Sequence, residues 1–86
     1  MIKNITILGA GESGFGAAML AHQKGHNVFV SDISEIRKDI KSIFVKNSIK
    51  FEEKDHSFDK IKFSDLIIKS PGIPDTSIII SKIKSF

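Results

Sequence analysis

The sequence predicts an α/β fold, a Rossmann-like parallel sheet of about four strands with helices on both faces. Short runs of branched apolar residues alternate with amphipathic segments, a pattern typical of strands that are covered on both sides. The first apolar run also stops at a glycine cluster that opens a helical segment. This alternation implies right-handed crossovers between parallel strands, with helices packed on the two faces of the sheet.

The predicted strands are the apolar runs themselves. Ile5, Ile7 and Leu8 mark the first of them, and the last contains three apolar residues, 66–68, that we expect to be buried. The four predicted strands span residues 2–8, 27–31, 49–52 and 65–70.

The predicted helices fill the segments between these strands. Ile36, Ile40, Ile43 and Phe44 recur at helical spacing and form one apolar face. Gly25 is placed to end the first helix in a left-handed conformation. The first two helices are predicted over residues 13–24 and 34–46, and a single helical turn over residues 57–61.

After the fourth strand, the segment Ser70-Pro71-Gly72-Ile73-Pro74 is predicted to be a stiff loop, because two prolines and a glycine prevent regular structure. A last helix would begin near Asp75 or Thr76, since either side chain can cap it. Its residues 79, 80 and 83 are isoleucines that would face the sheet.

Length and composition limit what the chain can be. Its 86 residues allow one small domain, covering residues 1–86. The absence of cysteine excludes a disulfide framework, a thiolate metal site and a cysteine nucleophile. No apolar run reaches the roughly 18 residues of a membrane span, and no signal peptide is recognisable. The net charge is +3, and the basic residues are scattered along the sequence rather than clustered. The chain also has no Tyr or Trp on which bases could stack. We therefore predict no nucleic-acid partner.

The glycine cluster has the spacing G-x-G-x-x-G, at Gly9, Gly11 and Gly14. In a strand-loop-helix unit, the first glycine allows the tight turn, the second lets a ligand approach the backbone, and the third lets the helix pack closely on the strand. The amides of the following helical turn favour an anion such as a phosphate. The cluster predicts a nucleotide near residues 9–14, and the alternative is a turn that only packs a helix on a sheet.

Three polar residues accompany this cluster. Asp32 lies 21 residues after Gly11, near the spacing of an acid that contacts a ribose, although with Glu35 it could instead form a capping box for the second helix. Glu12 is unusual in a glycine turn, since its carboxylate would repel a diphosphate unless it points to solvent or meets a base or sugar. Ser13 could cap the first helix or donate to a phosphate.

The sequence shows no catalytic constellation. His22, His26 and His56 are expected to be surface histidines, because no pair of them has metal-ligand spacing with a supporting acid. Neither a Ser-His-Asp order nor a P-loop lysine pattern is present. We therefore predict a chain that binds a ligand, holds no metal and does not itself catalyse a reaction.

The glycine cluster Gly9-Ala10-Gly11-Glu12-Ser13-Gly14, followed by Asp32 and by the loop Ser70–Pro74, resembles the N-terminal domain of the Mur ligases. The resemblance covers essentially the whole chain and is strongest to the ligases that add D-glutamate to UDP-N-acetylmuramoyl-L-alanine. Its most specific part is the serine-proline-glycine-isoleucine loop, because glycine loops alone do not separate these ligases from dehydrogenases.

This resemblance implies a role in peptidoglycan synthesis, and so in cell shape and division, in the bacterial cytoplasm. In the family, ATP activates a carboxylate as an acyl phosphate, and the amine of an amino acid attacks it. The first domain holds the UDP part of the substrate, the second holds ATP and Mg²⁺, and the third helps to bind the amino acid. The chain would be the first domain only, with no cofactor of its own and with UDP-N-acetylmuramoyl-L-alanine or UDP as its partner.

The resemblance also implies a UDP-substrate site in three loops. Glu12 and Ser13 would lie against the nucleotide, Asp32 would face the uracil or ribose, and Gly72 would close over the other side of the nucleoside. The ten residues implied are Gly11, Glu12, Ser13, Gly14, Asp32, Ile33, Ser34, Ser70, Pro71 and Gly72.

The chain departs from the family pattern in two places. Many members carry threonine and arginine after the acid, whereas Ile33 and Ser34 stand here, so we expect no charged contact from this segment. The family's domain also has a fifth strand after the last helix, and this sequence stops at Phe86. The edge of the sheet would then be open, or paired with another copy of the chain.

Two other functions are compatible with parts of the sequence. An NAD(P)-binding Rossmann module, from a dehydrogenase or a regulatory sensor, explains the three glycines and Asp32 but not Glu12 or the Ser70–Pro74 loop. A structural fragment that assembles through its sheet edge would keep no ligand at all.

Overall fold

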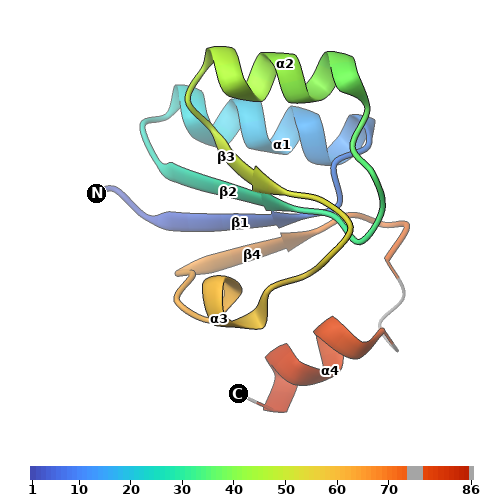
Figure 1. Ribbon diagram of the computed structural model, residues 1–86. Helices are drawn as coiled ribbons and strands as arrows, with labels where there is room; N and C mark the ends of the chain where they lie inside the picture. Colours follow the sequence, from blue (N-terminus) through green and yellow to red (C-terminus); the bar gives the residue numbers. More distant parts are fainter. Residues whose placement is uncertain (74–76, 86) are drawn as a thin grey trace.

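The computed structural model describes residues 1–73 and 77–85 as a parallel sheet with helices on both faces (Figure 1). The predicted fold class is confirmed, and so is the alternation of strands and helices. The strands are β1 (Asn4–Leu8), β2 (Asn27–Ser31), β3 (Lys50–Glu52) and β4 (Leu66–Lys69). The helices are α1 (Glu12–Gln23), α2 (Lys38–Lys46), α3 (Phe58–Ile61) and α4 (Ile78–Ser85).

The strand order in the sheet is β3-β2-β1-β4, and every pair is parallel. Ile7 in β1 lies opposite Val30 of β2 and Ile68 of β4. The chain builds outward from β1 to β3 and then crosses over to place β4 on the other side of β1. The direction of winding therefore reverses between β1 and β4, and ligands of such sheets bind at the carboxyl ends of the strands beside this point.

Side chains of β1 alternate between two hydrophobic cores. Ile5 and Ile7 pack with the fully buried Phe44 on the face covered by α1 and α2, whereas Leu8 packs with Ile61 on the face covered by α3 and α4 (Figure 1). The period of two along a strand produces this division. Helices α1 and α2 thus pack on one face of the sheet, and helices α3 and α4 pack on the other. The strands are held between these two layers, and this positions the loops at their ends.

The last helix packs as predicted. Ile79 and Ile80 are buried in the second core, and Ile83 packs against it. The predicted caps, Asp75 and Thr76, lie outside the described residues.

Two strands of the sheet, β1 and β4, differ from the predictions. β1 begins at Asn4, and Ile2 before it is exposed. Leu66 is 45% exposed, and residues 67 and 68 are only half-buried. The prediction that all three are buried is wrong, because β4 is an edge strand that pairs with β1 alone in the described sheet. Pairing of this edge with another copy stays a prediction.

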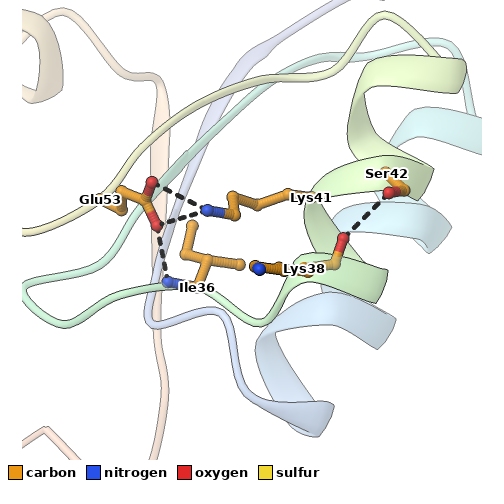
Figure 2. A network of polar contacts seen from close by, with 5 residues as sticks. All are labelled: Ile36, Lys38, Lys41, Ser42 and Glu53. Atoms are coloured by element: carbon orange, nitrogen blue, oxygen red, sulfur yellow. Dashed lines mark hydrogen bonds and ion pairs between the residues drawn. The ribbon is translucent and has the colours of Figure 1, made fainter.

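Helix α2 begins four residues later than the predicted start at Ser34. The N–H of Ser34 donates to Asp32 Oδ1 at 2.9 Å, and the N–H of Ile36 donates to Glu53 Oε1 at 2.9 Å. The backbone at Arg37 is extended, with φ −56° and ψ 142°, so a helix cannot run through it, and the two carboxylates hold the loop before it in place. Figure 2 shows that Glu53 also contacts the Nζ of Lys41, at 3.1 and 3.2 Å, which ties α2 to the end of β3.

Candidate functional site

The loops after β1 and β4 are packed directly on each other. Gly9 has φ +97°, a conformation that favours glycine, and a Cβ there would lie 2.7 Å from the Cβ of Ser70. The N–H of Ser70 donates to the carbonyl of Leu8 at 2.8 Å. The predicted tight turn at Gly9 is confirmed, and the proline loop lies beside it.

The other two glycines of the cluster have opposite surroundings. A Cβ at Gly14 would overlap the carbonyl oxygen of Gly9, so the close packing of α1 on the turn is confirmed. A Cβ at Gly11 would meet no heavy atom of the described protein within 4 Å. Gly11 therefore faces open space, as the approach of a ligand to the backbone would require.

The first turn of α1 has no side-chain cap. The helix begins at Glu12 with Gly11 as its N-cap residue, so the alternative in which Ser13 caps it is wrong. The amides of residues 12–14 have no partner within the helix by its geometry, and Glu12 and Ser13 are both exposed. Gly25 follows the helix with φ +87°, as predicted. An anion can reach the uncapped amides from solvent, which is the chemistry expected of a phosphate site.

Asp32 fastens the loop after β2 to the glycine turn. Its Oδ2 accepts the N–H of Ala10 at 2.8 Å, while its Oδ1 accepts the N–H of Ser34 at 2.9 Å. The capping box with Glu35 is wrong, because α2 begins only at Lys38. A carboxylate has about four lone-pair positions, so Asp32 can still accept from a ligand hydroxyl. Its contact with a ribose stays a prediction.

An apolar pocket of about 290 Å³ lies where the loop after β2 approaches the segment between β4 and α4. This volume is near the lower end for ligand pockets. Of the predicted site residues, Ile33 and Gly72 contribute to its wall, while Ser34, Ser70 and Pro71 do not. The described wall consists of Ile33, His56, Gly72, Ile73, Ser77, Ile78 and Ile79.

His56 was missed as a site residue, and its prediction as a surface histidine is wrong. It is half-buried, and its Nδ1 lies 2.7 Å from the Oγ of the fully buried Ser31. Ser31 Oγ also lies 2.8 Å from Glu52 Oε2, and Glu52 accepts two hydrogen bonds from Ser57. One signal could have revealed the group, because Ser31 and Glu52 end neighbouring parallel strands and are register partners.

Glu52 is held as a carboxylate by this group. Burial acts to raise its pKa, but the hydrogen bonds from the hydroxyl and the N–H of Ser57 and from the hydroxyl of Ser31 together outweigh burial. The pKa of Glu52 therefore lies below its ordinary value. An ionised carboxylate only accepts hydrogen bonds, which fixes the direction of the bond from Ser31.

A larger hollow, of about 530 Å³, lies at the opposite end of the sheet. Its wall includes Asn4 and Asn27, which open β1 and β2, and both His22 and His26. His26 Nδ1 accepts the N–H of Lys3 at 3.0 Å. Ligands of parallel sheets bind at the carboxyl ends of strands, so we assign the site to the smaller pocket. Among the described residues, no group of three or more His, Asp or Glu side chains could hold a metal ion.

A family model described as the MurD N-terminal domain matches residues 4–78. The chain belongs to the MurD N-terminal domain family. It is 48% identical over 84 residues to the UDP-N-acetylmuramoylalanine–D-glutamate ligase of Bacteroides thetaiotaomicron, covering 98% of this chain and 19% of that protein. It is 51% identical over 77 residues to the ligase of the same name from Porphyromonas gingivalis, covering 90% of this chain and 17% of that protein. The chain thus spans about a fifth of the length of the curated relatives it matches.

Two solved structures are similar to this chain in fold. A pseudomurein peptide ligase type C from Methanothermus fervidus matches 96% of this chain and 17% of its own, with a TM-score of 0.85 and 30% identity. A transhydrogenase from Sinorhizobium meliloti matches 84% of this chain and 21% of its own, with a TM-score of 0.64 and 25% identity. The ligase is the nearer of these two in fold. In the described part of the chain, no helix is long and apolar enough to cross a membrane.

Proposed function

We propose that this domain binds the UDP part of UDP-N-acetylmuramoyl-L-alanine, and that the whole protein joins D-glutamate to this substrate with ATP. The names of the relatives supply the substrate and the amino acid. One observation supports the assignment to this domain. Hydrogen bonds join the loops after β1, β2 and β4, and these loops lie beside an apolar pocket and the uncapped start of α1. The formation of the amide bond would belong to parts of the relatives outside this chain.

Each part of UDP has a chemically suitable place in the proposed site. The diphosphate would lie at Gly11, where space is open and the amides of the first turn of α1 attract an anion. The ribose would lie near Asp32, whose carboxylate has lone pairs left to accept a hydroxyl. The uracil would enter the apolar pocket between Ile33 and Gly72. Glu12 is exposed at the surface, so its carboxylate can remain in solvent, away from the diphosphate.

An NMR titration of the chain with UDP, and separately with NAD, tests this proposal. UDP is expected to shift the amide signals of Gly11, Ser13, Asp32 and Gly72, because these residues surround the proposed site. NAD is expected to cause no comparable shifts. Shifts with NAD alone would contradict the proposal in favour of a dinucleotide module, and silence with both ligands would indicate a domain that has kept its fold without its ligand.

Replacement of Asp32 by alanine is expected to weaken UDP binding by about 1–3 kcal/mol and to lower the free energy of unfolding by a similar amount. The variant removes the acceptor of two backbone amides, at Ala10 and Ser34, and loosens the glycine turn. Calorimetry and urea denaturation measure the two effects. Asp59→Ala is the control, since this aspartate is 94% exposed on α3. Lower stability with unchanged affinity would show that Asp32 only fastens the loops.

A further inference from the structure

His56 is the titratable side chain in the described wall of the apolar pocket. Its backbone N–H donates to Asp55 Oδ1 at 2.8 Å, and its ring Nδ1 lies 2.7 Å from Ser31 Oγ. The backbone and one edge of the ring are therefore both held. The other ring nitrogen, Nε2, makes no hydrogen bond within the described structure and is the one left for a ligand.

The proton on this ring can be placed from its neighbours. The hydroxyl of Ser31 has one proton, and its two other neighbours are Glu52 Oε2 at 2.8 Å and the carbonyl oxygen of Asp55 at 3.2 Å. Both are acceptors, so Ser31 donates to one of them and turns a lone pair toward the ring. The His56 Nδ1 must then carry a hydrogen and donate to Ser31. In a neutral histidine with a proton on Nδ1, Nε2 is an acceptor.

We propose that Nε2 of His56 is the specificity-determining group for the base, which it recognises by accepting the N3–H of uracil. This inference rests on the proposed function, in which the base enters the pocket beside Ile33 and Gly72. Uracil carries a hydrogen on N3, whereas the N3 of cytosine is itself an acceptor. With cytosine, the Nε2 of His56 and the N3 of the base would both be acceptors, and neither would have a hydrogen-bond partner in the apolar pocket. Such a mismatch strongly weakens binding.

The test compares the affinities of UDP and CDP for the chain at pH 8, by calorimetry. The wild-type chain is expected to bind UDP roughly tenfold or more tighter than CDP. His56→Phe keeps a flat ring but has no ring nitrogen. The ratio of UDP affinity to CDP affinity is therefore expected to fall toward one, mainly because UDP binds more weakly. His22→Phe is the matched control, because His22 lies at the opposite end of the sheet, and it is expected to keep the preference.

The position of the ring proton gives a second readout that needs neither a ligand nor a variant. Long-range ¹H–¹⁵N NMR spectra of the chain are expected to show the neutral His56 ring protonated at Nδ1. Protonation at Nε2 would overturn the inference, and so would a UDP preference that survives in His56→Phe. Equal binding of UDP and CDP by the wild-type chain would overturn the role of His56 alone, whereas binding of neither would overturn the proposed function together with it.

Discussion

Gly14→Ala is expected to destabilise the domain by more than about 3 kcal/mol, at the upper end of what an extra methyl group costs in a packed core. The new Cβ would overlap the carbonyl oxygen of Gly9 and lie 2.8 Å from its carbonyl carbon. Gly9 cannot shift away from the new methyl group, because its N–H donates to the carbonyl oxygen of Ser31 at 2.8 Å and Gly9 is packed against Ser70. Urea denaturation followed by circular dichroism measures the loss.

Gly16→Ala is the matched control for this prediction. Gly16 lies two residues further along the same helix, is exposed, and has no heavy atom within 4 Å of a built Cβ. Alanine is favoured over glycine inside a helix by about 0.5–1 kcal/mol, so this variant is expected to be more stable than the wild type. Equal stability of the two variants would show that α1 does not pack on the turn as closely as described.

The fold was predictable because its signals are local. The apolar runs around Ile7, Val30 and Ile67 each fill one strand, and the glycines at 9 and 25 stand where the backbone needs a positive φ. A parallel sheet follows from the alternation itself, since each strand is joined to the next by a crossover that packs on one face. No knowledge of distant contacts is needed for these steps.

The start of α2 was not predictable in the same way. The helical spacing of Ile36 and Ile40 is real, and both residues are buried in the first core. The backbone before Lys38 is nevertheless not helical: Arg37 is extended, with ψ 142°, and the N–H of Ile36 donates to Glu53, far along the chain. A periodic pattern records which residues face the core, and it does not record the backbone conformation between them.

The site was predictable only in part, for a related reason. The glycine turn and Asp32 are recognisable by spacing, and the structure brings them together through the bond to Ala10. His56 was predicted to be a surface histidine, yet it and Glu52, the last residue of β3, contact a buried serine. Polar residues are buried when they satisfy one another, and such mutual satisfaction depends on the strand register, which composition alone does not show.

Gly11→Val is expected to weaken UDP binding by at least about a hundredfold while the fold persists. The backbone at Gly11 has φ −73° and ψ −167°, an extended conformation that valine adopts readily, and its surroundings are open. Valine is disfavoured relative to glycine at an N-cap position, so the free energy of unfolding should fall by about 1 kcal/mol, which leaves the domain folded. The added methyl groups would occupy the space where we propose that the diphosphate lies.

The same NMR titration with UDP measures this effect, and urea denaturation shows whether the fold is kept. Gly16→Val is the control, because it places the same side chain in open space one turn further along α1, away from the three loops. Its UDP binding is expected to match the wild type. Retained binding in Gly11→Val would exclude the glycine turn as the diphosphate site, since a ligand that tolerates a branched side chain there cannot be lying against that backbone.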